Sequence, residues 1–299
     1  MAAPHDQPLA RTGVEIAAAD SDATLIALWL HGRSAHTQRA YRRDIARFRE
    51  SVKKPLTEVT LGDVQDFARD LEDRALAPAS RARTLAALKS LLSFGHRIGM
   101  LAVDVGRPLR LPPRKDTLAE RILTEDEVQR MLSAETEPRN RALLLALYFG
   151  GLRVSEACGL RWRDLRTRQE GGQITVYGKG AKTRAVLLPA GPFNALLGLR
   201  RSRDGPTDPV FRSRNQKALS TVRAWQIVRA AAERVGITVG VSPHFLRHSH
   251  ASHALDNGAP IHLVQATLGH ASVATTGRYL HVRPGASSGQ YLGKGNTHG

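Results

Sequence analysis

Hydrophobic residues recur at helical spacing along most of the first hundred residues. Val64, Phe67, Ala68 and Leu71 lie three or four positions apart, so they fall on one face of a helix. Ser34 precedes another run of this kind, which begins at Ala35. A serine side chain at that position can accept a hydrogen bond from the free amides of the first helical turn. The pattern predicts four helices, over Ala23–Leu30, Ala35–Glu50, Leu61–Arg74 and Pro78–Ile98.

The helical pattern breaks at residues 106–117, which hold three prolines. Proline lacks an amide hydrogen and disfavours helix continuation. We therefore predict a linker here, between a helical domain over 20–105 and a second domain over 118–285. Residues 1–19 and the Gly- and Ser-rich residues 286–299 are expected to be flexible ends.

The second domain also reads as mostly helical, with one interruption. Gln173–Tyr177 alternates between polar and apolar residues, and Ala185–Leu188 is apolar. Gly178-Lys179-Gly180 lies between them, and this pattern is typical of a β-hairpin with a basic tip. Thr124 followed by Glu127 fits a capping box. We predict a mainly α protein with a small hairpin or sheet, its further helices lying over Asn140–Phe149, Leu152–Leu160, Phe193–Arg201, Ser220–Val235, Pro243–Asp256, Ile261–Leu268 and Ser272–His281.

Charge narrows the choice of partner. The 299 residues include 44 Lys and Arg against 27 Asp and Glu, a net charge of +17, which favours a polyanion such as DNA or RNA. Cys158 is the single cysteine, so no intrachain disulfide is possible, as suits a reducing compartment. The sequence has no apolar run of 18 residues and no secretory signal pattern, so we expect a cytoplasmic protein without a membrane partner.

Two segments carry side chains suited to phosphate. Arg153 follows Gly150 and Gly151 in GLRVSE, and its planar fork can bind two phosphate oxygens. Glu156, three residues on, lies on the same helical face and can hold a neighbouring side chain in place. In the second segment, SPHFLRH, His244 and Arg247 share the first turn of a helix, where free amides also favour an anion.

Three further residues complete a candidate site. Lys179 lies at the predicted hairpin tip, and His270 follows Gly269, a natural helix C-cap. Nine residues later Tyr279 stands among small and polar residues. A free tyrosine has a pKa near 10, but nearby cations favour its anion and stabilise charge on a phosphorane.

These motifs, in this order, resemble the tyrosine recombinase (phage integrase) family over about residues 20–285. The resemblance implies that Tyr279 attacks a DNA phosphate, giving a 3′-phosphotyrosine, and that Lys179 protonates the leaving oxygen. It implies that the two arginines clamp the phosphate, that the two histidines hydrogen-bond it and help move the tyrosine proton, and that no cofactor is needed. The implied catalytic set is Arg153, Lys179, His244, Arg247, His270 and Tyr279, with Glu156 as an organising residue.

The resemblance also implies an architecture. A helical, SAM-like core-binding domain and a mostly helical catalytic domain would enclose double-stranded DNA, and four protomers would act on two duplexes. The basic residues expected to contact DNA outside the catalytic set are Arg39, Arg42, Arg43, Lys182 and Arg184.

Other histidines near the candidate site allow a different interpretation. His244 and His248 are spaced i, i+4, as in helical zinc sites, with His250 and His253 close by. However, the glutamate of HExxH is missing and a second cysteine is absent. We therefore predict no metal site, and expect His248 to pack or bond to backbone and His250 and His253 to be satisfied core residues.

Two other functions share parts of this pattern. A type IB-like DNA topoisomerase or hairpin-forming resolvase would use the same phosphotyrosine chemistry without exchange between duplexes. A DNA-binding regulator would need the basic surface and none of the chemistry. The complete set of six candidate residues argues against the regulator, and the length and two-domain layout favour the recombinase over the topoisomerase.

Overall fold

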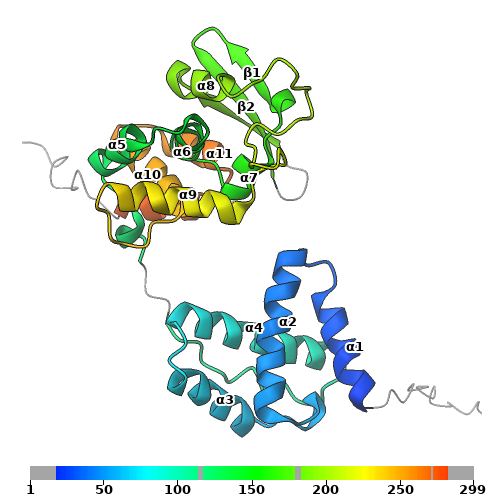
Figure 1. Ribbon diagram of the computed structural model, residues 1–299. Coiled ribbons are helices and arrows are strands. Elements are labelled where there is room, and N and C mark those ends of the chain that lie inside the picture. The colour runs from blue at the N-terminus through cyan, green and yellow to red at the C-terminus, as the bar shows by residue number, and fades with distance from the viewer. Residues whose placement is uncertain (1–17, 114–116, 179–182, 271, 282–299) are drawn as a thin grey trace, which may run out of the picture. The chain divides into compact units, whose positions relative to one another are not determined.

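The computed structural model describes residues 18–113, 117–178, 183–270 and 272–281. The chain divides into two compact units, Met1–Lys115 and Asp116–Gly299 (Figure 1). Lys179, Lys182 and most of the two ends predicted to be flexible lie outside the described residues.

The N-terminal unit is a group of helices around one apolar core. Phe48 of α2 (Ala35–Val52) and Phe67 of α3 (Leu61–Asp73) meet edge to face in that core, with ring centroids 5.1 Å apart. As predicted, Ser34 caps α2 by accepting a hydrogen bond from the amide of Thr37. A reciprocal capping box of Thr60 and Asp63, which was not predicted, starts α3. The elements are α1 (Ala18–Leu30), α2 (Ala35–Val52), η1 (Leu56–Glu58), α3 (Leu61–Asp73) and α4 (Pro78–Arg97).

The first residues of the predicted linker belong to this unit. Leu109 is 7% exposed and lies in the N-terminal core. Lys89 of α4 holds the segment by donating from Nζ to the carbonyl oxygens of Arg107 and Leu109, at 2.9 and 2.8 Å. The proline-containing segment predicted as a linker starts at residue 106, but the buried apolar residues of the N-terminal core continue to Leu109.

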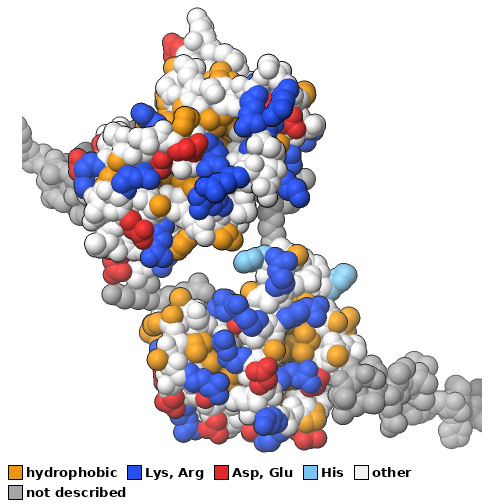
Figure 2. Space-filling view, in the orientation of Figure 1, with side chains coloured by type: hydrophobic (Ala, Val, Ile, Leu, Met, Phe, Trp, Pro, Cys, Tyr) orange, Lys and Arg blue, Asp and Glu red, His pale blue; other side chains and the backbone are white. Residues whose placement is uncertain are grey.

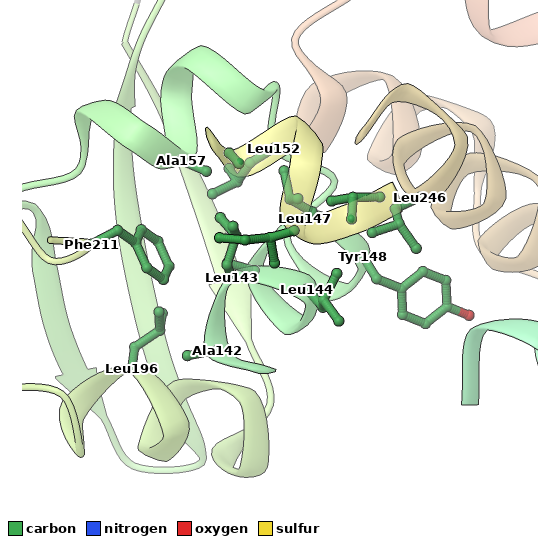
Figure 3. Packing of buried hydrophobic residues seen from close by; sticks show 14 of the residues in the cluster. Ala142, Leu143, Leu144, Leu147, Tyr148, Leu152, Ala157, Leu196, Phe211 and Leu246 are labelled. Atoms are coloured by element: carbon green, nitrogen blue, oxygen red, sulfur yellow. The ribbon is translucent and has the colours of Figure 1, made fainter. Parts of the chain in front are cut away.

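The second unit is mainly helical, as predicted, and its core surrounds α6 (Pro138–Phe149). Leu143, Leu144 and Leu147 of α6 are fully buried, and Figure 3 shows them between Leu246 and Phe211. The predicted capping box of Thr124 and Glu127 is present at the start of α5. The helical elements are η2 (Ala119–Arg121), α5 (Glu125–Ala134), α6 (Pro138–Phe149), α7 (Val154–Gly159), η3 (Trp162–Asp164), α8 (Ala190–Leu197), α9 (Thr221–Arg234), α10 (Pro243–Asp256), α11 (Ile261–Leu268), α12 (Val273–Gly277) and η5 (Arg278–His281).

The predicted hairpin is part of a three-stranded antiparallel sheet, ordered β1 (Leu165–Arg168), β2 (Gly171–Tyr177) and β3 (Thr183–Leu188). Tyr177 pairs with Thr183 at the end of the hairpin next to the turn, and Lys179, predicted at the tip, lies outside the described residues. The sequence pattern missed β1, whose polar residues are mostly exposed and carry no apolar alternation.

Candidate active site

Arg153 is held at the start of α7 by Glu156. The sequence predicts a helix from Leu152, but α7 begins at Val154 and Arg153 is its N-cap, with an extended backbone. The amide of Arg153 donates to Glu156 Oε2 and its Nη1 donates to Oε1, both at 2.8 Å. Burial favours a raised pKa for Glu156, but hydrogen bonds from Arg184 and Arg153 outweigh it and hold the pKa at about 2. The carboxylate is therefore an ionised anchor for both arginines.

Gly151 allows the chain to turn directly before Arg153. Its φ of +53° lies in the left-handed region, which favours glycine. A Cβ there would meet the side chains of Leu268 at 2.8 Å and His250 at 2.9 Å. The turn therefore needs glycine both for its backbone conformation and for its close approach to α10 and α11.

Arg247 of α10 is the most deeply placed cation of the site. It is 5% exposed, and its Nη1 and Nη2 donate to the carbonyl oxygens of Gly151 and Leu268. Burial, and then the charge of Arg153, lowers the pKa of Arg247 to about 10, so it remains a cation at neutral pH. Each of these nitrogens carries a second N–H, so the guanidinium is fixed in place and can still donate to a ligand.

Arg184 does not occupy the position that the sequence predicts for it. We expected a DNA contact, but its side chain is only 13% exposed. Nη1 and Nη2 donate to the two oxygens of Glu156, at 2.9 and 2.7 Å, and Nε donates to the carbonyl oxygen of Thr267 at 2.7 Å. Arg184 thus binds strand β3 to α7 and to the end of α11, and the DNA-contact prediction is corrected to a role in positioning.

His270 and His244 lie close to these arginines. His270 Nδ1 and Thr276 Oγ1 are 2.9 Å apart, which fixes the ring beside α12. Burial, then the charges of Arg247 and Arg153, lowers the pKa of His270 to about 4, and the same causes lower the pKa of His244. Ser242 is the N-cap of α10, but its side chain makes no capping hydrogen bond.

Tyr279 packs inward and meets a histidine that the sequence analysis had set aside. It is 5% exposed, and its hydroxyl lies 2.7 Å from Nδ1 of His248. We expected His248 to pack or to bond to backbone; its ring does pack against that of Tyr279, but its hydrogen bond joins it to the tyrosine hydroxyl, which the sequence had not indicated. The signal available was its position one turn after His244, but nothing local connects it with a tyrosine 31 residues away.

The expectation for His253 was correct. Its Nε2 donates to the carbonyl oxygen of Leu123 and its Nδ1 accepts from the hydroxyl of Tyr148, both at 2.9 Å. Among the described residues, no group of three or more His, Cys, Asp or Glu side chains could hold a metal ion. None of the helices described is both long enough and apolar enough to cross a membrane.

A surface depression gives access to this side of α10. Its lining includes Arg121, Ser242, His244, Phe245 and His248. Because His244 and His248 line this depression, they are reachable from solvent, although the site behind them is largely buried.

Figure 2 shows Lys and Arg side chains spread over the visible face of each unit.

Comparison with known proteins places the whole arrangement in one class. The model of the phage integrase family matches residues 121–285, and that of the phage integrase N-terminal SAM-like domain matches residues 25–98. The chain belongs to the phage integrase family.

Among its relatives, tyrosine recombinase XerD of Mycobacterium tuberculosis (strain H37Rv) is 37% identical over 280 residues, covering 84% of this chain and 88% of that protein. Tyrosine recombinase XerC of Xanthomonas campestris pv. campestris (strain B100) is 37% identical over 261 residues, covering 83% and 79%. The crystal structure of XerH site-specific recombinase bound to difH substrate, a pre-cleavage complex, shares the fold, with a TM-score of 0.68 at 22% identity over 87% of this chain and 81% of that one.

Proposed function

We propose that this protein is a site-specific DNA recombinase that cuts and rejoins DNA through a 3′-phosphotyrosine intermediate on Tyr279. One observation carries the proposal. Arg247 is fixed between the carbonyl oxygens of Gly151 and Leu268, beside Arg153 and the buried hydroxyl of Tyr279. The named XerC and XerD relatives are tyrosine recombinases, which supports the same activity here.

Each side chain has a step in this reaction. Arg153 and Arg247 bind the non-bridging oxygens of the scissile phosphate and stabilise the charge that builds up on them. His244 and His270 hydrogen-bond the same phosphate. Tyr279 Oη attacks phosphorus, the bond from phosphorus to O5′ breaks, and Lys179 protonates the leaving oxygen. The phosphotyrosine keeps the bond energy, so rejoining needs no ATP, and no metal takes part.

The partner that we propose is double-stranded DNA. Arg39, Arg42 and Arg43 of α2 are exposed, and solved relatives of the same fold carry DNA in their crystals. Exposed arginines bind phosphates through charge and release counterions, independently of sequence. We further propose that four protomers assemble on two duplexes and that the protein works in the cytoplasm on the nucleoid.

A covalent trap tests this function. We expect the protein to form an adduct on a nicked duplex, the duplex having been selected by binding from a random-sequence library. Saturating EDTA should leave the adduct unchanged, and Tyr279→Phe should abolish it while DNA binding persists. An adduct retained by Tyr279→Phe contradicts the assignment. Strand exchange between two labelled duplexes separates a recombinase from a topoisomerase, which relaxes supercoils without exchange.

A further inference from the structure

The attack by Tyr279 requires that its phenolic proton go somewhere. In the described part of the chain, neither His244 nor His270 forms a hydrogen bond with that hydroxyl, and His270 Nδ1 is engaged by Thr276. The atom within hydrogen-bond distance of Tyr279 Oη is Nδ1 of His248, at 2.7 Å. The two rings also contact each other, with centroids 5.8 Å apart.

We propose that His248 is a catalytic residue, the group that accepts the proton of Tyr279 Oη during cleavage and returns it during rejoining. The inference rests on the proposed function, since it requires Tyr279 to be the nucleophile. In cleavage the bond from Oη to phosphorus forms, the bond from phosphorus to O5′ breaks, and the phenolic proton passes to His248 Nδ1. In rejoining the 5′-hydroxyl attacks, Oη leaves, and His248 returns the proton to it.

The electrostatic surroundings of His248 keep its imidazole neutral in the resting protein, as a proton acceptor requires. Burial, then the charges of His244, Arg121, Arg247 and Arg278, lowers the pKa of His248 to about 4. The imidazole is therefore neutral at neutral pH, and Nδ1 can accept from the hydroxyl. Burial raises the pKa of Tyr279, while Arg247 and Arg278 oppose that rise, so the hydroxyl keeps its proton at rest.

A bound phosphate changes this balance in the direction that the reaction needs. A phosphodiester between Arg153 and Arg247 brings a negative charge close to the cations that depress the pKa of His248. Negative charge nearby favours a protonated imidazole. A bound phosphate therefore makes His248 a better proton acceptor, and because Oη bonds to phosphorus as its proton leaves, no free phenolate has to form beside the phosphate.

The position of His248 allows a chemical test. It lines the depression beside Arg121 and His244, so a small base from solution can reach the space that its removal leaves. We would measure adduct formation by the full-length protein on the nicked duplex described above. His248→Ala is expected to slow the rate by about 10²-fold or more, with little change in DNA affinity, and added imidazole should restore part of the rate.

Two variants separate proton transfer from packing. His248→Asn can keep a hydrogen bond to Oη but cannot take up the proton, so it should fold normally and remain slow. Replacing Tyr279 with a ring-fluorinated tyrosine, whose phenol is more acidic, should recover much of the rate lost in His248→Ala. His262→Ala, at an exposed position on α11, is the matched control and should be unaffected by imidazole.

The outcomes are distinct. Wild-type rates in His248→Asn, or a faster reaction in His248→Ala, would show that the hydrogen bond only holds the tyrosine at rest. A slow His248→Ala that neither imidazole nor the fluorinated tyrosine improves would reduce His248 to a packing residue. Either result overturns this inference alone, whereas an adduct formed by Tyr279→Phe overturns the proposed function as well.

Discussion

The two units place their arginines in opposite ways. On α2 of the N-terminal unit, Arg39, Arg42 and Arg43 are exposed, and none of them has an ion-pair partner among the described residues. In the second unit, Asp116–Gly299, which we call the catalytic unit, Arg247 is 5% exposed and Arg184 is 13% exposed, and both are fixed by protein oxygens. An exposed arginine can follow a DNA backbone, whereas a buried, fixed one can hold a single phosphate in one geometry. Under the proposed function, the exposed arginines of α2 bind the DNA backbone, Arg247 holds the reacting phosphate, and Arg184 positions Glu156.

The largest effect should come from the most deeply fixed cation. Under the proposed function Arg247 donates to the reacting phosphate, and losing one such donor typically costs ~10²–10³-fold in rate. We expect at least that loss in the single-turnover rate of adduct formation. Arg247→Lys should not restore it, because an ammonium cannot reproduce the planar fork. A rate near wild type for Arg247→Lys would mean that charge alone suffices.

Removing the shared anchor of two arginines should destabilise the catalytic unit. Glu156 is 7% exposed in its side chain and pairs with both Arg153 and Arg184. Breaking a buried pair on one side costs about 3–5 kcal/mol, so Glu156→Ala should reduce amide protection in that unit by hydrogen exchange. Thr60→Ala, which removes an exposed cap in the N-terminal unit, should cost only about 1 kcal/mol. Equal losses would remove the distinction between the units.

A matched pair of glycines tests the turn before Arg153. Both Gly151 and Gly32 have positive φ, but a Cβ at Gly32 would meet nothing within 4 Å. Gly32→Ala should therefore cost only backbone strain, roughly 1–2 kcal/mol. Gly151→Ala also forces Leu268 and His250 apart, so it should cost more and slow cleavage. Normal cleavage by Gly151→Ala would show that the turn can relax.

Acid should weaken the catalytic unit. The pKa values of His248, His250 and His270 are lowered to about 4, in each case chiefly by burial. An unfolded histidine, with a pKa near 6.5, takes up a proton more readily than these folded ones. Stability is therefore complete above pH ~6.5 and is lost progressively as the pH falls towards 4. Hydrogen exchange at pH 7 and pH 5 checks this, and unchanged protection of α10 and α11 would contradict it.

The smallest effect concerns the exposed arginines of α2. Arg39→Ala, Arg42→Ala and Arg43→Ala should each lower DNA affinity modestly, with little change in the rate of the bound complex. Each lost phosphate contact should reduce the slope of log affinity against log salt by about 0.9. A variant that changes the rate at saturating DNA and leaves the salt slope intact would argue against a backbone contact.

The sequence predicted what depends on local pattern. Helical spacing located the helices, and the capping box at Thr124 and Glu127 marked the start of α5 correctly. Local pattern did not reveal β1, because an exposed strand of Leu and polar residues has no apolar alternation.

Contacts between distant segments were beyond the sequence. Arg184 looked like any basic residue of a hairpin, and only the register of β3 beside α7 and α11 turns it towards Glu156 and Thr267. His248 and Tyr279 are separated by 31 residues and meet only because α10 and η5 pack together.

The central claim is that Tyr279 carries the DNA during the reaction. The most direct test is to trap the covalent complex on the nicked duplex, digest it, and identify the modified peptide by mass spectrometry. We predict a nucleotide attached through its 3′-phosphate to Tyr279, on the peptide that contains TTGRYLH. A nucleotide on any other residue, with Tyr291 as the nearest rival in the sequence, would contradict the account.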